Sequence, residues 1–339
     1  MKTRNYLLFA FIALIVFGCS TKDNDVTITG IIRGNIPERV FYSYPTNGTN
    51  FWNFTRTVTP DSLGNFTIRM LTDKPTFVNI LTKSNPVIIV EPNGKYEIEI
   101  DLTSDEETYS VNSNLESIQN FYSSLLKTNP KNCIFPYGDV SSNFDEKVLV
   151  FKEKLEFELK EIEEIYNNSN ISKELFELIS LDREIYYLTA QMVLASKNWL
   201  SNTQKTSTIP SNVLEVWQDA ALSVSLENEN LLRTNFSYDF LDMFLWYKVY
   251  TTYELEEFRK LRADLKERDK SHSHKLELAR QFIENRKALE LYSAAYIHMN
   301  SFRESRDIIS CYESFVLEYP GSKFNEFLSP VFELKIQKE

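Results

Sequence analysis

The stretch YEIEIDLTSDEE, residues 96–107, marks the point where the chain changes its kind of structure. Every second residue from Tyr96 to Leu102 is apolar, which is the period of a strand with one buried face. The acidic cluster Asp105-Glu106-Glu107 ends this alternation. Beyond it, apolar residues recur at steps of three and four, the period of an amphipathic helix. We therefore predict an α+β protein of two domains, with the boundary near residue 104.

Upstream of this boundary, residues 26–103 have the pattern of an all-β domain. Short alternating runs are separated by turn signals, among them Asn47-Gly48 and Asp61-Ser62-Leu63-Gly64-Asn65. Such spacing favours an antiparallel β-sandwich over βαβ units. About seven short strands are expected, at residues 26–34, 39–44, 54–59, 66–70, 77–81, 87–90 and 96–102.

Downstream, residues 104–112 are predicted to be a linker and residues 113–339 an all-α helical domain. The clearest helix spans about 148–166, where apolar residues follow steps of three and four and the other face is Lys and Glu. Ser172 is placed to cap the next helix, which runs to about Trp199. Residues 128–142 are expected to form a structured loop and 201–212 a polar linker. Other helices are expected at 115–126, 213–220, 238–249, 252–267, 274–296, 302–318 and 323–337.

The N-terminus has the features of a secretory signal. Residues 5–19, NYLLFAFIALIVFGC, follow the basic residues Lys2 and Arg4. The apolar run is shorter than the roughly 20 residues of a membrane-spanning helix, and it ends at a small residue. The residues before the cysteine resemble a lipoprotein processing box, so we expect residues 1–18 to be removed and Cys19 to be lipidated. An ordinary signal peptide or an uncleaved anchor is the alternative.

Residues 19–25 are predicted to be an acidic tether between the lipid and the folded chain. The chain has 48 acidic against 37 basic residues and a net charge of −11, which disfavours nucleic acid and anionic headgroups as partners. Two or more acyl chains anchor a protein stably on their own. We therefore predict an outer-membrane lipoprotein, held by the lipid on Cys19, that faces the periplasm or the cell surface. A protein partner in the envelope is a hypothesis.

Five stretches resemble the β domain and helical region of TlpA-type thioredoxin-like lipoproteins, a family of thiol-disulfide oxidoreductases. They are Val26-Thr27-Ile28-Thr29-Gly30, residues 61–66 (DSLGNF), 89–98 (IVEPNGKYEI), 181–187 (LDREIYY) and 315–323 (FVLEYPGSK). The resemblance covers residues 20–335 and implies the same two-part fold. It also implies a following thioredoxin domain with a WCxxC site. That domain is expected to be absent here, so no catalytic residue is carried over.

The pattern of cysteines does not indicate a site for redox catalysis. No CxxC occurs, and once Cys19 is lipidated only Cys133 and Cys311 remain, far apart in the sequence. These two cysteines either form a disulfide with each other or serve as two separate small apolar residues. The sequence leaves both possibilities open. We expect no disulfide reductase activity, because turnover needs an attacking thiolate beside a resolving thiol.

Three groups of residues are candidates for binding. The aromatic loop with Tyr44, Phe51 and Trp52 lies around the Asn-Gly turn and could stack on a sugar or a peptide; the alternative is that these rings face the core. His272 and His274 could seed a metal site but are expected in a solvated loop, and His298 is expected to be a packing residue. The third group, expected to be a solvated helix face, is Glu153, Glu156, Glu158, Glu161, Glu163 and Glu164.

A dense aromatic run between residues 217 and 250 is expected to pack between helices, with a partner groove as the alternative. No metal, cofactor or catalytic residue is predicted. The sequence thus favours a non-catalytic binding or scaffold lipoprotein of the cell envelope. The alternative is a truncated or split component of a thiol-disulfide system, whose thioredoxin part would be a separate chain.

Overall fold

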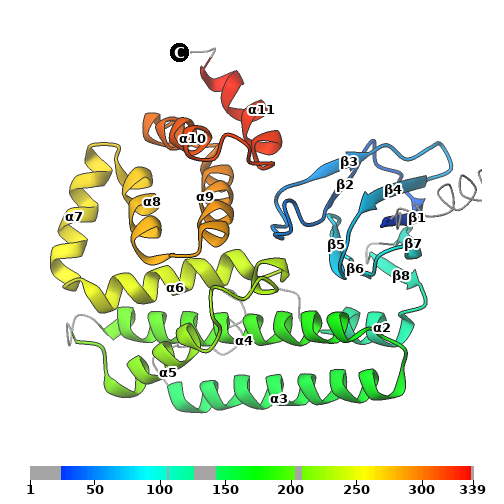
Figure 1. Ribbon diagram of the computed structural model, residues 1–339, viewed down its shortest axis with the longest axis horizontal. Helices are drawn as coiled ribbons and strands as arrows, with labels where there is room; N and C mark the ends of the chain where they lie inside the picture. The colour runs from blue at the N-terminus through cyan, green and yellow to red at the C-terminus, as the bar shows by residue number, and fades with distance from the viewer. Residues whose placement is uncertain (1–23, 105–106, 126–142, 203–207, 337–339) are drawn as a thin grey trace, which may run out of the picture.

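The computed structural model describes residues 24–104, 107–125, 143–202 and 208–336. The described strands gather at one end of the molecule and the helices form the rest (Figure 1). The α+β organisation in two successive regions is thus confirmed. The predicted signal 1–18, the loop 128–142 and most of the tether 19–25 lie outside the described residues.

The first sheet is mixed, not antiparallel. Its order is β4 (Asn65–Leu71), β1 (Asp25–Gly34), β7 (Lys95–Leu102) and β8 (Thr108–Asn112). β1 pairs with β4 antiparallel but with β7 in parallel, so Thr27 lies opposite Lys95. The prediction of an antiparallel sandwich was wrong for this pair. Alternation along one strand reports its buried face but not the direction of its neighbour.

The second sheet is antiparallel throughout. Its order is β3 (Arg56–Val58), β2 (Val40–Ser43), β5 (Thr76–Ile80) and β6 (Val87–Val90). All four residues of β6 are buried, because helices cover the face that would otherwise meet solvent. Each sheet therefore has four strands among the described residues.

The structure describes eight strands, whereas the sequence predicted about seven. The additional strand is β8. This strand lies within 104–112, the segment predicted to be a linker, and its Val111 is buried opposite Ile98 of β7. The segment has only two apolar positions and follows an acidic cluster, so its strand pattern was weak. The strand region accordingly extends to Asn112, and the first strand begins at Asp25, inside the predicted tether.

The predicted tight turn before β4 is confirmed in detail. The Oδ1 atom of Asp61 accepts hydrogen bonds from the backbone N–H groups of Leu63 at 2.8 Å and Asn65 at 2.9 Å. Gly64 has φ +85°, a conformation that side chains with a Cβ rarely adopt. The turn also contacts β1, because the carbonyl of Gly64 accepts from the backbone N–H of Ile32 at 3.0 Å.

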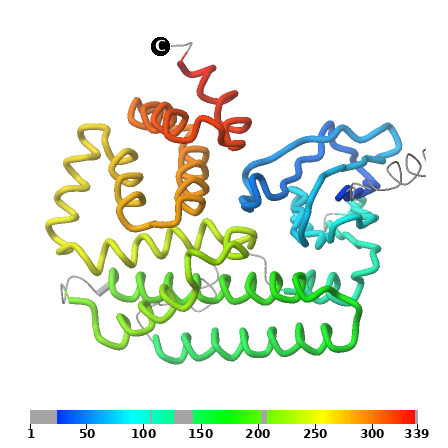
Figure 2. Tube along the Cα trace, viewed as in Figure 1, coloured from blue at the N-terminus to red at the C-terminus, as the bar shows by residue number. Residues whose placement is uncertain are grey.

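The helical region begins with α2 (Glu116–Ser124) and two long helices, α3 (Phe144–Asn168) and α4 (Lys173–Asn202). Helices α3 and α4 run side by side in opposite directions (Figure 2). The predicted cap is confirmed, since Ser172 Oγ accepts from the backbone N–H of Leu175 at 3.2 Å. The remaining helices are α5 (Ser211–Leu222), the short 3₁₀ helix η2 (Leu231–Arg233), α6 (Ser237–Thr252), α7 (Leu255–Glu267), α8 (Ser271–Phe282), α9 (Arg286–Asn300), α10 (Arg306–Glu318) and α11 (Asn325–Ile336).

One predicted helix is two. The sequence favoured a single helix over 274–296, but α8 ends at Phe282 and α9 begins at Arg286. Asn285 causes the break, because its side chain accepts from the backbone N–H of Ala288 at 2.9 Å and so caps a new helix. The apolar period continues across the break, which is why it was not recognised.

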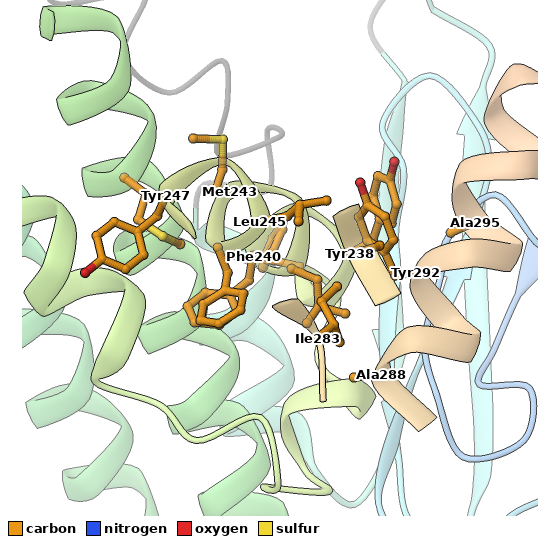
Figure 3. Close-up of a cluster of buried hydrophobic side chains, with 14 of the residues drawn as sticks. Tyr238, Phe240, Met243, Leu245, Tyr247, Ile283, Ala288, Tyr292 and Ala295 are labelled. Atoms are coloured by element: carbon orange, nitrogen blue, oxygen red, sulfur yellow. The ribbon is translucent and has the colours of Figure 1, made fainter. Parts of the chain in front are cut away.

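Two apolar cores connect the strand region to the helical region, because each contains residues from both. The core under the sheets includes Leu175 and Ile179 of α4, while the core of the helices includes Phe51 and Phe54 from the loop after β2. The predicted aromatic packing is confirmed for most of the run. In Figure 3, Tyr238 of α6 lies beside Tyr292 of α9, whereas Tyr247 points to the other side of α6, where it meets Trp217. Tyr238 of α6 and Tyr292 of α9, for example, stack with centroids 5.5 Å apart.

Candidate functional site

The predicted aromatic loop does not present its three rings together. Phe51 is buried, with its ring 4.9 Å from that of Phe54 and 5.2 Å from that of Tyr238. Trp52, the next residue, is 42% exposed. The chain turns here, with the backbone N–H of Phe54 donating to the carbonyl of Phe51 at 3.1 Å, so one ring of this pair packs into the helices and the other faces solvent.

Tyr44 lies apart from Trp52. The guanidinium carbon of Arg56 lies 4.1 Å from the Tyr44 ring centroid, and the same group lies over Phe327 of α11 at 4.9 Å. Arg56 also pairs with Glu326 of α11 at 3.1 Å. Tyr44 therefore helps join the second sheet to the last helix, which leaves Trp52 as the ring available to a ligand.

Trp52 lies at the edge of a cavity of about 280 Å³ between the second sheet, α2 and the start of α6, which we call the junction cavity. This volume is near the lower end for ligand pockets, about 300 to 1,000 Å³, and suits one ring-sized group. Of the described residues that line it, none is Lys, Arg or His. The lining residues are Trp52, Asn79, Ile80, Leu81, Asn85, Val87, Tyr122, Asn235, Phe236 and Asp239.

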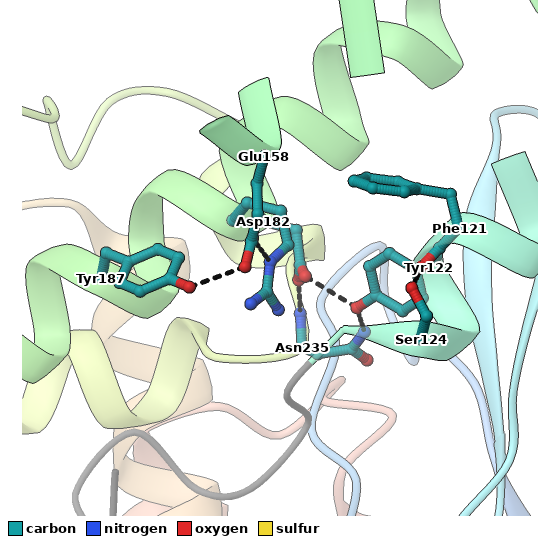
Figure 4. A network of polar contacts seen from close by, with 8 residues as sticks. Phe121, Tyr122, Ser124, Glu158, Asp182, Tyr187 and Asn235 are labelled. Atoms are coloured by element: carbon teal, nitrogen blue, oxygen red, sulfur yellow. Dashed lines mark hydrogen bonds and ion pairs between the residues drawn. The ribbon is translucent and has the colours of Figure 1, made fainter. Parts of the chain in front are cut away.

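Asn235 organises the floor of the junction cavity (Figure 4). Its backbone N–H donates to Asp182 Oδ1 at 2.7 Å and its Nδ2 donates to the hydroxyl of Tyr122 at 2.9 Å. Its Oδ1 accepts from Asn50 Nδ2 at 2.8 Å and from Asn79 Nδ2 at 3.3 Å. One asparagine thereby links the loop after β2, β5, α2 and α4.

The Tyr122 hydroxyl completes this network by donating to Asp182 Oδ2 at 2.7 Å. Both side chains are fully buried, and burial raises the pKa of Asp182 to about 6 although the Arg183 charge and these hydrogen bonds oppose the shift. Burial, with the neighbouring Asp182 carboxylate, also raises the pKa of Tyr122 well above its ordinary value. The floor is therefore rigid and its hydrogen-bonding groups are fixed before any ligand enters.

A buried ion pair lies behind the floor. Arg183 Nε donates to Glu158 Oε2 at 2.7 Å, and the Tyr187 hydroxyl donates to Glu158 Oε1 at 2.6 Å. The prediction that Glu158 belongs to a solvated face was wrong, whereas Lys160 and Glu164 on the same helix form the expected exposed pair at 3.8 Å. The signal that could have found this pair is Asp182-Arg183-Glu184, three consecutive charges inside an otherwise apolar stretch of α4.

The histidines do not form a metal site in the described chain. His272 and His274 lie on α8, not in the solvated loop that was predicted. His272 Nδ1 lies 2.9 Å from the Tyr296 hydroxyl, and burial lowers the pKa of this imidazole. His298 packs edge-on against Phe54 with centroids 5.3 Å apart, as expected for a packing residue. No group of three His, Cys, Asp or Glu side chains suited to a metal ion occurs among the described residues.

Of the cysteines, only Cys311 lies among the described residues; Cys19 and Cys133 lie outside them. Cys311 is buried in α10 as a free thiol. Burial, reinforced by the Asp307 carboxylate, raises the pKa of this thiol to about 12. A thiol with that pKa is protonated at neutral pH and is a poor nucleophile.

No protein-family model, curated protein or solved structure matches this chain. Within the described residues, no helix has the length and apolar character needed to cross a membrane.

Proposed function

We propose that this protein is a non-catalytic lipoprotein of the cell envelope that binds a small neutral ligand in the junction cavity. The observation that carries the proposal is the combination of one exposed indole, Trp52, with the fixed amides of Asn79 and Asn235. Function is commonly located on loops that a rigid scaffold positions, and the loop of Trp52 is fixed by the buried Phe51 next to it.

The lining favours a sugar ring as the ligand. An aromatic face packs against the C–H groups of a ring, while side-chain amides donate to and accept from hydroxyl groups. The lining has no cationic side chain, and Asp239 supplies the one carboxylate among the described lining residues. An anionic ligand would therefore meet no opposite charge in the cavity, and a neutral glycan unit fits better.

The cellular location follows from the N-terminal sequence. Lys2, Arg4, the apolar run and Cys19 support lipidation and an outer-membrane position, on the periplasmic or the exposed side. Replacing Cys19 with Ala should release the protein from the membrane fraction. Unchanged fractionation of that variant would contradict this part of the proposal.

The alternative is a component of a thiol-disulfide system that acts with a thioredoxin domain on a separate chain. It is supported by the sequence resemblance, whereas the buried, protonated Cys311 argues against thiol chemistry within this chain. Insulin reduction with dithiothreitol tests whether this chain has thiol chemistry of its own. The binding proposal expects background activity, unaffected by Cys133→Ser or Cys311→Ser.

Ligand binding is tested by saturation-transfer NMR of the mature protein with a panel of neutral mono- and disaccharides. Trp52→Ala should abolish the transfer signal of the bound sugar. The matched control is Phe41→Ala, which removes another exposed ring, 45% accessible, from β2 outside the cavity. Equal signals from both variants, or signals only from short peptides, would contradict a sugar site at Trp52.

A further inference from the structure

A second hollow, independent of the junction cavity, lies entirely within the helical region. It has a volume of about 980 Å³ and lies between α7 on one side and α6, α8 and α9 on the other; we call it the helical groove. Helix α7 lies at the outer edge of the molecule (Figure 1) and buries only Leu255 and Phe258. The weak packing of α7 leaves the groove open along one side of this helix.

The charge of the groove is opposite to that of the chain. The protein as a whole has 48 acidic and 37 basic residues. The described lining of the groove instead has five lysine or arginine side chains against three carboxylates. The cations are Arg259, Arg262, Lys266, Lys275 and Arg303, and the carboxylates are Asp242, Asp269 and Glu304.

Two of the three carboxylates are already used. Asp242 Oδ1 lies 3.1 Å from Lys275 Nζ and accepts from the Tyr292 hydroxyl at 2.9 Å. Asp269 accepts from Ser305 Oγ at 2.7 Å and from the backbone N–H of Asp307 at 3.3 Å, so it caps the start of α10. Neither is free to neutralise the cations on the rim.

Three rim cations are left for a partner. In the described part of the chain, Arg262, Lys266 and Arg303 have no carboxylate within ion-pair distance. Below them lies Lys275, whose side chain is only 10% exposed. Burying a cation is unfavourable unless its surroundings compensate it, and here Asp242 does so. The groove thus combines a fixed cation at its base with unpaired cations at its rim.

The apolar lining indicates what else the ligand carries. Met299, which is 39% exposed, and Ala263 and Leu265 of α7 offer surface for aliphatic side chains. Trp246, the largest ring in the groove, is not a platform for sugars, because Lys275 Nζ lies 3.6 Å and the Arg262 guanidinium 5.3 Å from its centroid. These contacts favour a peptide with carboxylates and aliphatic groups over an acidic glycan.

We propose that the helical groove binds an acidic peptide segment of a partner protein. The guanidinium groups of Arg262 and Arg303 pair with its carboxylates, in the two-pronged geometry that Arg and carboxylates favour. Its aliphatic side chains contact Ala263, Leu265 and Met299. This site is separate from the junction cavity and does not depend on the ligand proposed there.

The test is fluorescence anisotropy with a labelled peptide of alternating Glu and Leu, using the mature protein. A matched peptide with Lys in place of Glu and an oligogalacturonate are the other two probes. The wild type should bind the Glu peptide and neither of the others. Raising the salt concentration should weaken binding, because exposed charges are screened.

The double variant Arg262→Glu and Arg303→Glu should lower affinity for the Glu peptide at least tenfold. The double variant Arg262→Gln and Arg303→Gln removes the two charges without reversing them. It should give a smaller loss of affinity, and it checks that the effect of the Glu variant is not caused by misfolding. The control is Arg69→Glu with Lys152→Glu, two exposed cations on β4 and α3, which should leave binding unchanged. Equal losses in the groove and control variants, preferential binding of oligogalacturonate, or no binding of the Glu peptide would overturn the proposal.

Discussion

The ring of Phe66 covers Gly30 across the first sheet. The two residues lie opposite each other in the pairing of β4 with β1. A Cβ atom built at Gly30 would lie 2.1 Å from Phe66 Cζ, far inside van der Waals contact. Phe66 is buried, so its ring has no room to move aside. Phe66 can therefore pack in this position only because residue 30 is glycine.

Gly30→Ala should lower the free energy of unfolding by about 1 to 3 kcal/mol, the usual effect of overpacking a core. The control is Gly321→Ala, because a Cβ atom there has no heavy atom within 4 Å. Its effect should stay within about 0.5 kcal/mol. Urea denaturation followed by circular dichroism measures both, and equal midpoints would show that Phe66 can move away.

Glu158→Ala should be strongly destabilising, by about 3 to 5 kcal/mol, because it leaves the buried Arg183 without its partner carboxylate. Glu164→Ala on the same helix breaks an exposed pair and should change stability by less than about 0.5 kcal/mol. Thermal or urea unfolding distinguishes the two variants. Similar stabilities would mean that other groups compensate the Arg183 charge.

Asp182 should make stability fall as the pH rises. Its pKa is about 6 in the folded chain against an ordinary value of 3.8, so the folded state holds an extra proton between these values. Stability therefore decreases through this window and is lower above it, by up to about 3 kcal/mol. Asp182→Asn cannot titrate. The stability of the wild type minus that of the variant should decrease from pH 4 to 7 in chemical denaturation, and parallel pH profiles would refute the assignment.

Cys311 should resist alkylation in the folded protein. With its pKa raised to about 12 by burial, almost none of the thiol is deprotonated near pH 8. Mass spectrometry after iodoacetamide treatment checks this in a variant with Cys19→Ser and Cys133→Ser, which leaves Cys311 as the one thiol of the chain. The native protein should stay unmodified and the urea-unfolded protein should react. Rapid modification of the native protein would show that α10 opens.

Local sequence patterns predicted most elements but not how they are joined. Alternation in residues 65–71 and the steps of three and four in residues 148–166 depend only on which face is buried, and both elements formed as predicted. The parallel pairing of β1 with β7 depends on residues distant in the sequence. No local period reports such partners.

The candidate sites show the same limit. Trp52 was recognised as a candidate because an aromatic residue near an Asn-Gly turn is visible in sequence. Its partners Asn79, Tyr122 and Asn235 were not, because they come from a strand, a helix and a loop that meet only in the folded chain. The helical groove was missed for this reason too, since its cations are spread over α7, α8 and the loop after α9.

The parallel pairing of β1 with β7 affects the order in which the protein can fold during synthesis. Thr27 meets Lys95 and Gly34 meets Leu102, so the whole intervening chain must close as one long loop. Closing such loops is entropically unfavourable and slows folding. A chain that emerges N-terminus first leaves one edge of β1 unpaired until residue 102 has followed it. The first sheet therefore cannot be completed on a short nascent chain, and the buried face of β1 lacks one neighbouring strand until most of the strand region has been synthesised.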